Sequence, residues 1–146
     1  MVLTVSHLGL CVSDLERSLR FYRDGLGFEP AGAHEVGGEF ARLMELGSLE
    51  VSSRMLRRDG VMLELLAFAT PAAVGPTDRR PMNQLGFTHL ALRVDDVAAV
   101  AATIEEFGGA VVEGTRTVLD IGGMPLDFVY CTDPDGVRIE LMALGG

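Results

Sequence analysis

Short apolar segments alternate with turns along the first half of the chain, and one segment has helical spacing. Residues 2–12 are apolar and rich in β-branched residues, which predicts a strand buried on one face. Ser13 and Asp14 are typical N-cap residues, and the apolar spacing after them predicts a helix that ends near Asp24-Gly25. Further strands are predicted at 28–36, 49–57 and 61–68, with a short helix or loop at 39–45 and Asp59-Gly60 as a hairpin turn.

The second half of the chain repeats this order. A predicted strand at 87–94 precedes a helix at 97–107, and three strands follow at 110–118, 124–132 and 137–144, with a flexible turn at 120–123. Residues 69–86 contain three prolines and no periodicity, which predicts a linker. We therefore predict one domain over 1–146 with an α+β fold of two tandem βαβββ modules, at about 1–70 and 87–146. Each mixed sheet would carry its helix on the outside and leave the other face bare, so that the modules enclose a cleft.

Each half also carries one histidine and one glutamate at matching places. His7 and His89 lie 82 residues apart in the first strand of each half, and Glu64 and Glu140 lie 76 apart in the last. A carboxylate in the middle of a half-buried strand is costly without a partner. Two imidazoles and two carboxylates suit zinc, nickel, cobalt, manganese or ferrous iron. We therefore predict that these four residues bind one divalent metal ion.

Composition limits the class of partner. The chain has 146 residues with a net charge of −9, which disfavours nucleic acid or an anionic membrane surface as a partner. No apolar run approaches the roughly 20 residues that a membrane span needs. The N-terminus has no signal-peptide features, and Cys11 and Cys131 form no disulfide framework, so we expect a cytoplasmic protein.

Other residues are weaker candidates for the predicted cleft. Arg93 shares its strand face with His89 and is predicted either to bind a substrate carboxylate or phosphate or to form a surface salt bridge. Cys11 is expected to be a small apolar wall, and His34 a solvated residue of an edge strand or loop. Residues such as Tyr130 lie on strands that border the cleft, with no pattern that fixes which way they face.

The two copies of the histidine and glutamate segments, together with Asp133-Pro134-Asp135-Gly136, resemble the vicinal oxygen chelate superfamily. That superfamily includes glyoxalase I, methylmalonyl-CoA epimerase, extradiol dioxygenases, fosfomycin-resistance enzymes and bleomycin-binding proteins. The resemblance implies paired βαβββ modules around a metal ion, usually within a homodimer. It also implies Glu140 as the catalytic base and Glu64 as its partner on the opposite side of the substrate.

Details of the motifs distinguish among the members. Glyoxalase I typically has arginine and asparagine where this chain has Cys11 and Phe68, although its four metal ligands match. Methylmalonyl-CoA epimerases commonly have glutamine at the position of Glu64.

The resemblance implies a metal-dependent lyase or isomerase that stabilises an enediolate or enolate of a small carbonyl or acyl-thioester substrate and transfers a proton. Alternatives are a small-molecule-binding resistance protein without turnover, or an extradiol-type dioxygenase that uses His7, His89 and Glu140.

Overall fold

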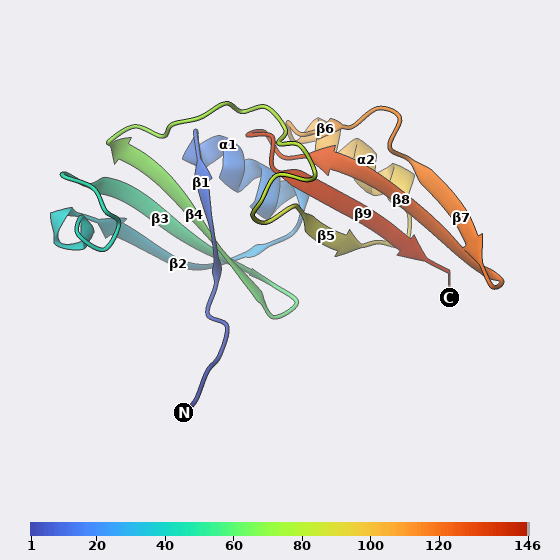
Figure 1. Ribbon diagram of the computed structural model, residues 1–146, viewed down its shortest axis with the longest axis horizontal. Coiled ribbons are helices and arrows are strands. Elements are labelled where there is room, and N and C mark those ends of the chain that lie inside the picture. Colours follow the sequence, from blue (N-terminus) through green and yellow to red (C-terminus); the bar gives the residue numbers. More distant parts are fainter. Residues whose placement is uncertain (146) are drawn as a thin grey trace. The chain divides into compact units, whose positions relative to one another are not determined.

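The computed structural model describes residues 1–145, and the chain divides into two compact units, Met1–Gly75 and Pro76–Gly146 (Figure 1). Each unit consists of one β-sheet and a helix that packs on one face of that sheet. The predicted α+β class is therefore confirmed.

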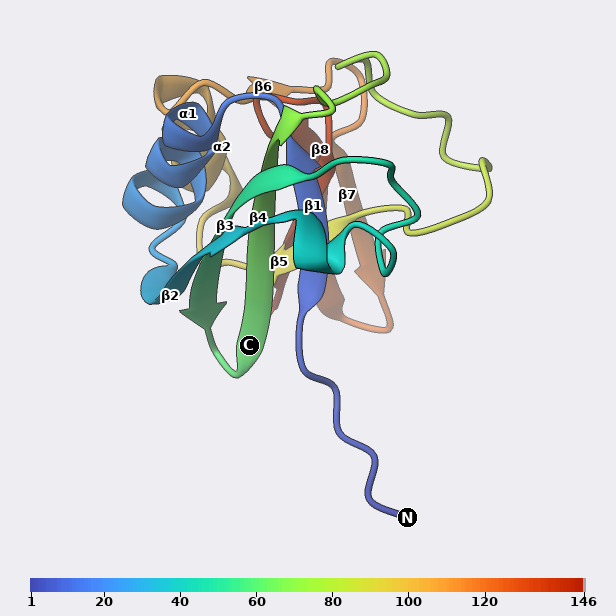
Figure 2. The same cartoon turned by 90° about the vertical axis from the view of Figure 1, so that its left-hand side faces the viewer.

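The first unit has four strands. Its elements are β1 (Leu8–Val12), α1 (Leu15–Leu19), the π-helical turn η1 (Arg20–Gly25), β2 (Glu29–Val36), the 3-10 turn η2 (Gly38–Phe40), β3 (Glu50–Arg58) and β4 (Val61–Thr70). The strand order is β1-β4-β3-β2, in which β1 runs parallel to β4 and the other pairs are antiparallel. Helix α1 lies against β4, on one face of this sheet (Figure 2).

Alternation along β4 explains which face of the first sheet is the core. Leu63 and Leu65 are 2% and 0% exposed, whereas Glu64 between them points to the opposite face. Phe21 and Tyr22 of η1 are fully buried with these leucines in the core of the unit. The helix therefore covers the apolar face of the sheet, and the opposite face, which carries Glu64, is not covered by it.

The second unit repeats the plan, with its second strand split into two. Its elements are β5 (Leu90–Arg93), α2 (Val97–Glu106), β6 (Ala110–Val111), β7 (Thr117–Ile121), β8 (Met124–Thr132) and β9 (Arg138–Leu144). The strand order is β5-β9-β8-β6, and β7 also pairs with β8. Strand β5 runs parallel to β9, as β1 does to β4.

The first strand of each unit is shorter than predicted. Residues 2–7 are not in β1, although their composition favours a strand. The register pairs Leu8 with Leu63, and the neighbouring strand β4 begins at Val61 after the turn at Asp59-Gly60. Residues before Ser6 therefore have no strand to pair with, and pairing rather than composition sets where β1 begins.

The predicted strand at 110–118 is wrong as a single element. The backbone turns between Val112 and Thr115, with a positive φ of 76° at Gly114, and this turn separates β6 from β7. The hydroxyl of Thr115 donates to the Val112 carbonyl at 2.7 Å and accepts from the Tyr130 amide at 3.1 Å. At this point the Thr115 hydroxyl takes the place of a backbone partner in the hydrogen bonding between the strands. Strand β7 then extends to Ile121, inside the predicted flexible turn.

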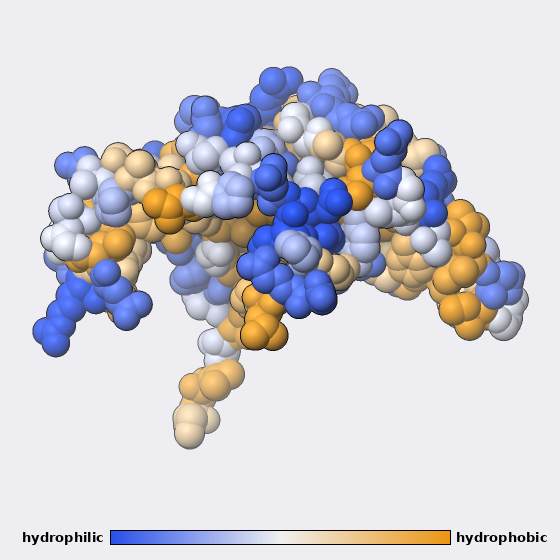
Figure 3. Space-filling view, turned by 45° about the horizontal axis from the view of Figure 1, so that its top comes forward, coloured by the Kyte–Doolittle hydropathy of each residue, from blue (hydrophilic) through white to orange (hydrophobic). Residues whose placement is uncertain are grey.

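Apolar side chains are exposed at the β7–β8 end of the second sheet (Figure 3). They are Val118, Leu119, Ile121 and Met124, with exposed fractions of 67%, 47%, 63% and 51%. Within residues 1–145, no helix is long and apolar enough to cross a membrane.

Candidate functional site

The first unit brings His7 and Glu64 together across the parallel pair β1–β4. His7 directly precedes β1, and the register places Gly9 beside Glu64. His7 Nε2 lies 3.1 Å from Glu64 Oε2, and the two side chains are 40% and 20% exposed. The Ser6 hydroxyl lies 2.9 Å from His7 Nδ1, which leaves Nε2 directed at the glutamate. This unit therefore presents one imidazole nitrogen and one carboxylate oxygen side by side.

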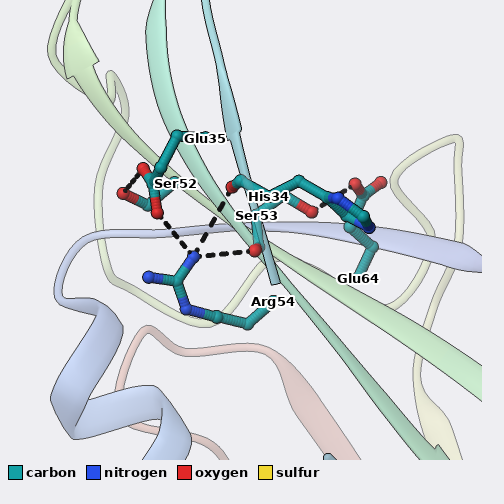
Figure 4. Close-up of polar contacts among 6 residues, drawn as sticks. All are labelled: His34, Glu35, Ser52, Ser53, Arg54 and Glu64. Carbon is teal, nitrogen blue, oxygen red and sulfur yellow. Dashed lines mark hydrogen bonds and ion pairs between the residues drawn. The ribbon is translucent and has the colours of Figure 1, made fainter. Parts of the chain in front are cut away.

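The second oxygen of Glu64 is held from β3. The Ser53 hydroxyl donates to Glu64 Oε1 at 2.6 Å, and Ser53 is fully buried (Figure 4). Ser53 sits one strand away, between the edge strand β2 and Glu64 on β4. A buried hydroxyl with one strong acceptor fixes the carboxylate in one orientation. Ser53 could not be predicted from the sequence pattern, because only the cross-strand register places it beside Glu64.

Arg54, the residue after Ser53 on β3, bonds to groups outside the His7–Glu64 pair. Arg54 donates to Glu35 at 2.9 Å and to the carbonyls of Ser53 and His34 (Figure 4). The hydrogen bond from Ser52 and then the bond from Arg54 hold the pKa of Glu35 below its usual range. His34 lies in the edge strand β2 and is exposed, as predicted, and it pairs with Ser53 in the register.

The second unit repeats the pair with His89 and Glu140. Strand β5 pairs with β9 in parallel so that Ala91 lies beside Glu140. His89 Nε2 lies 3.2 Å from Glu140 Oε2, with exposed fractions of 26% and 20%. The Thr88 hydroxyl lies 2.9 Å from His89 Nδ1, the role that Ser6 has in the first unit. The duplication that the sequence indicates is thus present in the side-chain geometry of each unit.

Tyr130, rather than a serine, lies beside the second glutamate. It is the direct cross-strand neighbour of Glu140, and its ring meets the His89 ring edge-on with centroids 5.7 Å apart. Burial, and then the adjacent Glu140 carboxylate, raise the pKa of Tyr130, so its phenol stays protonated at neutral pH. The loop between β8 and β9 sets this register, which is why the sequence pattern left the facing of Tyr130 open.

Arg138 contacts residues next to the His89–Glu140 pair. Its guanidinium lies 5.4 Å from the Tyr130 ring centroid, and the residue is 8% exposed. It donates to the carbonyl of Arg80 at 2.8 Å and has longer contacts of 3.5 Å to the Thr88 carbonyl and the Met82 sulfur. Arg138 therefore ties the segment before His89 to the strands that carry Tyr130 and Glu140.

A pocket of about 270 Å³ opens beside Glu140 within the second unit. It is lined by Thr115, Thr117, Phe128, Val129, Tyr130 and Glu140. Arg93, the predicted substrate-binding residue, is exposed on the Glu140 face of the sheet, because the register pairs it with Met142. It lines a separate pocket of about 460 Å³, together with Asp95, Asp127 and the end of β9.

The donor set suits a divalent metal ion. Each unit offers an imidazole nitrogen with its second nitrogen held by a hydroxyl, and a carboxylate oriented by a neighbouring side chain, as is usual around metal ligands. Within the described part of the chain, no group of three or more histidine, cysteine, aspartate or glutamate side chains comes together. Each unit thus holds one histidine–glutamate pair as candidate ligands.

Several curated proteins are similar to this chain over most of its length. A probable lactoylglutathione lyase of Synechocystis sp. is 31% identical, over 93% of this chain and 92% of that protein. A probable lactoylglutathione lyase of Vibrio cholerae is 30% identical, over 94% and 88%. A 2-epi-5-epi-valiolone epimerase of Actinomyces sp. is 27% identical, over 96% and 79%.

Solved structures share the fold. A glyoxalase family protein from Bacillus cereus aligns with a TM-score of 0.84 at 22% identity, over all of this chain and 97% of that one. The fosfomycin resistance protein FosX from Listeria monocytogenes, complexed with Mn(II) and sulfate, aligns with a TM-score of 0.61 at 16% identity, over 98% and 93%. The family model of the Glyoxalase/Bleomycin resistance protein/Dioxygenase superfamily matches residues 4–141. With nearly the whole chain matched, the protein belongs to this superfamily, which confirms the resemblance seen in its motifs.

Proposed function

We propose that His7, Glu64, His89 and Glu140 together bind one divalent metal ion and that the protein is a metal-dependent isomerase or lyase. The observation that carries this proposal is the repeated pair: an imidazole nitrogen 3.1 or 3.2 Å from a carboxylate oxygen at the same place in each unit. The proposed ion is zinc, nickel, cobalt, manganese or ferrous iron. When bound, such an ion supplies Lewis-acid stabilisation of an enolate or enediolate oxygen.

Glu140 is the proposed base that removes a proton from the carbon next to the substrate carbonyl. It lines the pocket in its unit, and its neighbour Tyr130 is a neutral hydrogen-bond donor rather than a competing base. A carboxylate in contact with the substrate can take a proton and return it. Glu64 is the proposed second proton-transfer group, acting on the opposite side of the substrate, as epimerisation requires.

The hydrogen bond from Ser53 distinguishes Glu64 from Glu140 as a proton-transfer group. With one oxygen bonded to Ser53 and the other beside His7, Glu64 has both oxygens engaged. Such a carboxylate is better suited to hold an ion than to leave it. We therefore propose Glu140 as the first proton-transfer group and Glu64 as the second, with both glutamates also binding the ion, a small molecule as substrate and a homodimer as the working form.

Proton transfer is favoured over simple sequestration or oxygen chemistry. The relatives at 30% and 31% identity are named as lyases, and the relative at 27% is named as an epimerase. Both glutamates are retained here, whereas a binding protein without turnover needs neither as a base. Two such carboxylates are what reversible proton transfer on two sides of a carbon requires.

The test is deuterium exchange by the metal-loaded protein. The chain is reconstituted with each of the five metals, and solvent deuterium entering the carbon next to the carbonyl is followed by NMR. The substrates are dihydroxyacetone and the hemithioacetal of methylglyoxal and glutathione. Glu140→Gln should lower the exchange rate by about 100-fold or more, because the general base is lost. Metal content, measured in parallel by mass spectrometry, separates loss of the base from loss of the ion.

The exposed Glu113→Gln is the matched control and should leave the exchange rate unchanged. Exchange that continues at the wild-type rate in a metal-loaded Glu140→Gln protein would show that Glu140 is not the base. If none of the five metals binds, the proposed function itself is wrong.

A further inference from the structure

We infer that Arg138 is a positioning residue for the His89–Glu140 pair, because it holds the segment that carries His89 against the strands that carry Tyr130 and Glu140. This inference rests on the proposed function, since it takes His89 and Glu140 as metal ligands. It goes further by naming a residue that acts on the ion only through its neighbours. The first unit has no counterpart of this residue, so the effect belongs to the second unit alone.

Arg138 is a buried cation, and the groups that its guanidinium contacts are not carboxylates. The residue is only 8% exposed. Its guanidinium contacts two backbone carbonyls, one sulfur and one aromatic ring, which belong to Arg80, Thr88, Met82 and Tyr130. Removing a guanidinium from water is costly unless new hydrogen bonds replace those it made to water. The two carbonyls can do this only while the segment that contains them stays next to β9, so Arg138 and this segment hold each other in place.

The segment 80–88 leads directly to His89 and is folded around the side chain of Arg80. That side chain donates to three carbonyls further along the segment, at 3.0, 2.8 and 3.2 Å, which belong to Gln84, Leu85 and Phe87. Arg138 in turn donates to the carbonyl of Arg80 at 2.8 Å. The paired residues of β5 and β9 begin at Leu90, so His89 lies just outside the ladder. The position of His89 therefore depends on this segment as well as on the strand that follows it.

The guanidinium of Arg138 also meets the residues around Glu140. It lies 5.4 Å from the centroid of the Tyr130 ring, and that ring meets the His89 ring edge-on with centroids 5.7 Å apart. Tyr130 is the cross-strand neighbour of Glu140, and Arg138 lies two residues before Glu140, on the same face of β9. One side chain thus contacts both the segment that carries His89 and the ring beside Glu140. This arrangement keeps His89 Nε2 at 3.2 Å from Glu140 Oε2.

Met62 stands in the first unit where Arg138 stands in the second. Each follows an Asp-Gly-Val sequence and lies two residues before the glutamate of its pair. Residues 1–7 are exposed, and the side chain of His7 is 40% exposed compared with 26% for His89. This difference is what a fastening residue in one unit alone would produce. Since the first unit has methionine at this place in its strand, Arg138→Met removes the guanidinium without introducing a shape that is foreign to the fold.

The experiment compares Arg138→Met and Arg138→Lys with the wild type as full-length proteins. Zinc affinity is measured by competition with a chelator, and the histidine rings are followed separately by nitrogen-15 NMR, with and without zinc. In Arg138→Met, we expect zinc affinity to fall by about 10- to 100-fold, as for other neighbours that orient metal ligands. The ring signals of His89 should move, whereas those of His7 should stay unchanged.

Two further variants show whether the guanidinium itself is responsible. Arg138→Lys keeps the charge but loses the planar group that spans the carbonyls and the ring, so its zinc affinity should be between that of the wild type and that of Arg138→Met. Arg58→Met is the matched control, because the Arg58 guanidinium also donates to a backbone carbonyl, that of Leu26, in a part of the first unit that carries no proposed ligand. It should leave both the zinc affinity and the His89 signals unchanged. Urea unfolding of each metal-free variant measures any general loss of stability.

The outcomes separate this inference from the proposed function. If the wild type binds zinc and Arg138→Met binds it equally well, the inference is overturned and the proposed function stands. If the wild type binds no metal but the His89 signals alone move in metal-free Arg138→Met, the proposed function is wrong while Arg138 still positions His89. Equal changes at His7 and His89, or an equal loss of affinity in Arg58→Met, would reveal a general effect on the fold and would also overturn the inference.

Discussion

Glu64 and Glu140 occupy equivalent places in the two units but have different neighbours. Glu64 accepts a hydrogen bond from the buried Ser53, whereas Glu140 lies beside the phenol of Tyr130 and opens onto a pocket. A small buried hydroxyl holds a carboxylate still, while a phenol at a pocket wall can also reach a ligand. The chemistry proposed for each glutamate follows from these neighbours rather than from the glutamates themselves.

Removing the Ser53 hydroxyl should weaken metal binding. In Ser53→Ala, Glu64 Oε1 loses its donor, so the carboxylate is no longer fixed in its ligating orientation. We expect the affinity for the ion to fall by about 10- to 100-fold, measured by competition with a chromogenic chelator. Ser52→Ala is the control, because the Ser52 hydroxyl bonds to the exposed Glu35. Equal losses in the two variants would show that Ser53 has no special role.

The two cysteines should differ sharply in reactivity. Burial, and then the carboxylate of Glu105, raise the pKa of Cys131 to about 11, whereas Cys11 is exposed. A thiol reagent at pH 8 should therefore label Cys11 in the native protein and reach Cys131 only after unfolding. Rapid labelling of both thiols under native conditions would contradict this.

The same pKa shift gives Cys131 an effect on stability in alkali. The thiol ionises near pH 9 in the unfolded chain but only near pH 11 in the folded one. Its contribution is thus complete below pH 9 and is lost as the pH rises from 9 to 11. Over that range, urea unfolding should show the wild type losing about 2 kcal/mol more than Cys131→Ala. Parallel curves for the two proteins would contradict the assignment.

At the level of the elements, helix starts are the features that the sequence predicts best. The predicted cap Asp14 accepts a hydrogen bond from the Arg17 amide at 2.9 Å, and Asp96 does the same for the Ala99 amide at 3.0 Å. Capping depends on residues three apart, so a local pattern is enough to find it.

The Asp96 cap can be tested directly. Asp96→Ala should lower the free energy of unfolding by about 1 kcal/mol in urea titrations, because the first turn of α2 loses its side-chain acceptor. The neighbouring exposed Asp95→Ala is the control and should have little effect. A larger loss in Asp95→Ala than in Asp96→Ala would show that the cap has been assigned to the wrong residue.

Strand bounds and side-chain neighbours that depend on pairing between distant strands were harder to predict from the sequence. Periodicity placed β8 and found β4 and β9 to within two residues, because their alternation is strong. It failed at residues 2–5, where no neighbouring strand is available, and at 110–118, where Thr115 interrupts the ladder. The repeated histidines and glutamates correctly indicated equivalent positions that lie side by side in each unit, and their role as a site stays a prediction. Ser53, Tyr130 and Arg138 join these pairs only through the strand register.

At the scale of the whole molecule, the proposed ion draws a ligand pair from each unit, so binding should be coupled to stability. With free metal at about 100 times its dissociation constant, the native state gains about 2.7 kcal/mol. For a chain of this size, removing the metal with EDTA should lower Tm by about 5 to 10 °C. The double variant His7→Ala/His89→Ala should show no such shift. An EDTA effect of equal size in that variant would place the ion elsewhere.

Mixing two complementary variants tells whether the two pairs come from one chain or from two. One variant has His7→Ala and Glu64→Ala, and the other has His89→Ala and Glu140→Ala. If sites form between subunits, refolding the two together restores metal binding in the mixed dimers. If each chain completes its own site, the mixture binds no more metal than the separate variants.

Each unit has a hydroxyl beside its histidine, from Ser6 in the first unit and Thr88 in the second. The residues beside the two glutamates differ, because one is Ser53 and the other is Tyr130. The two units are thus alike at the imidazole end and different at the carboxylate end. If the proposed function is correct, substitutions in one half can change the substrate while the other half continues to bind the proposed ion. New specificities should therefore arise in this lineage through substitutions around Thr117 and Tyr130 before any around Ser53.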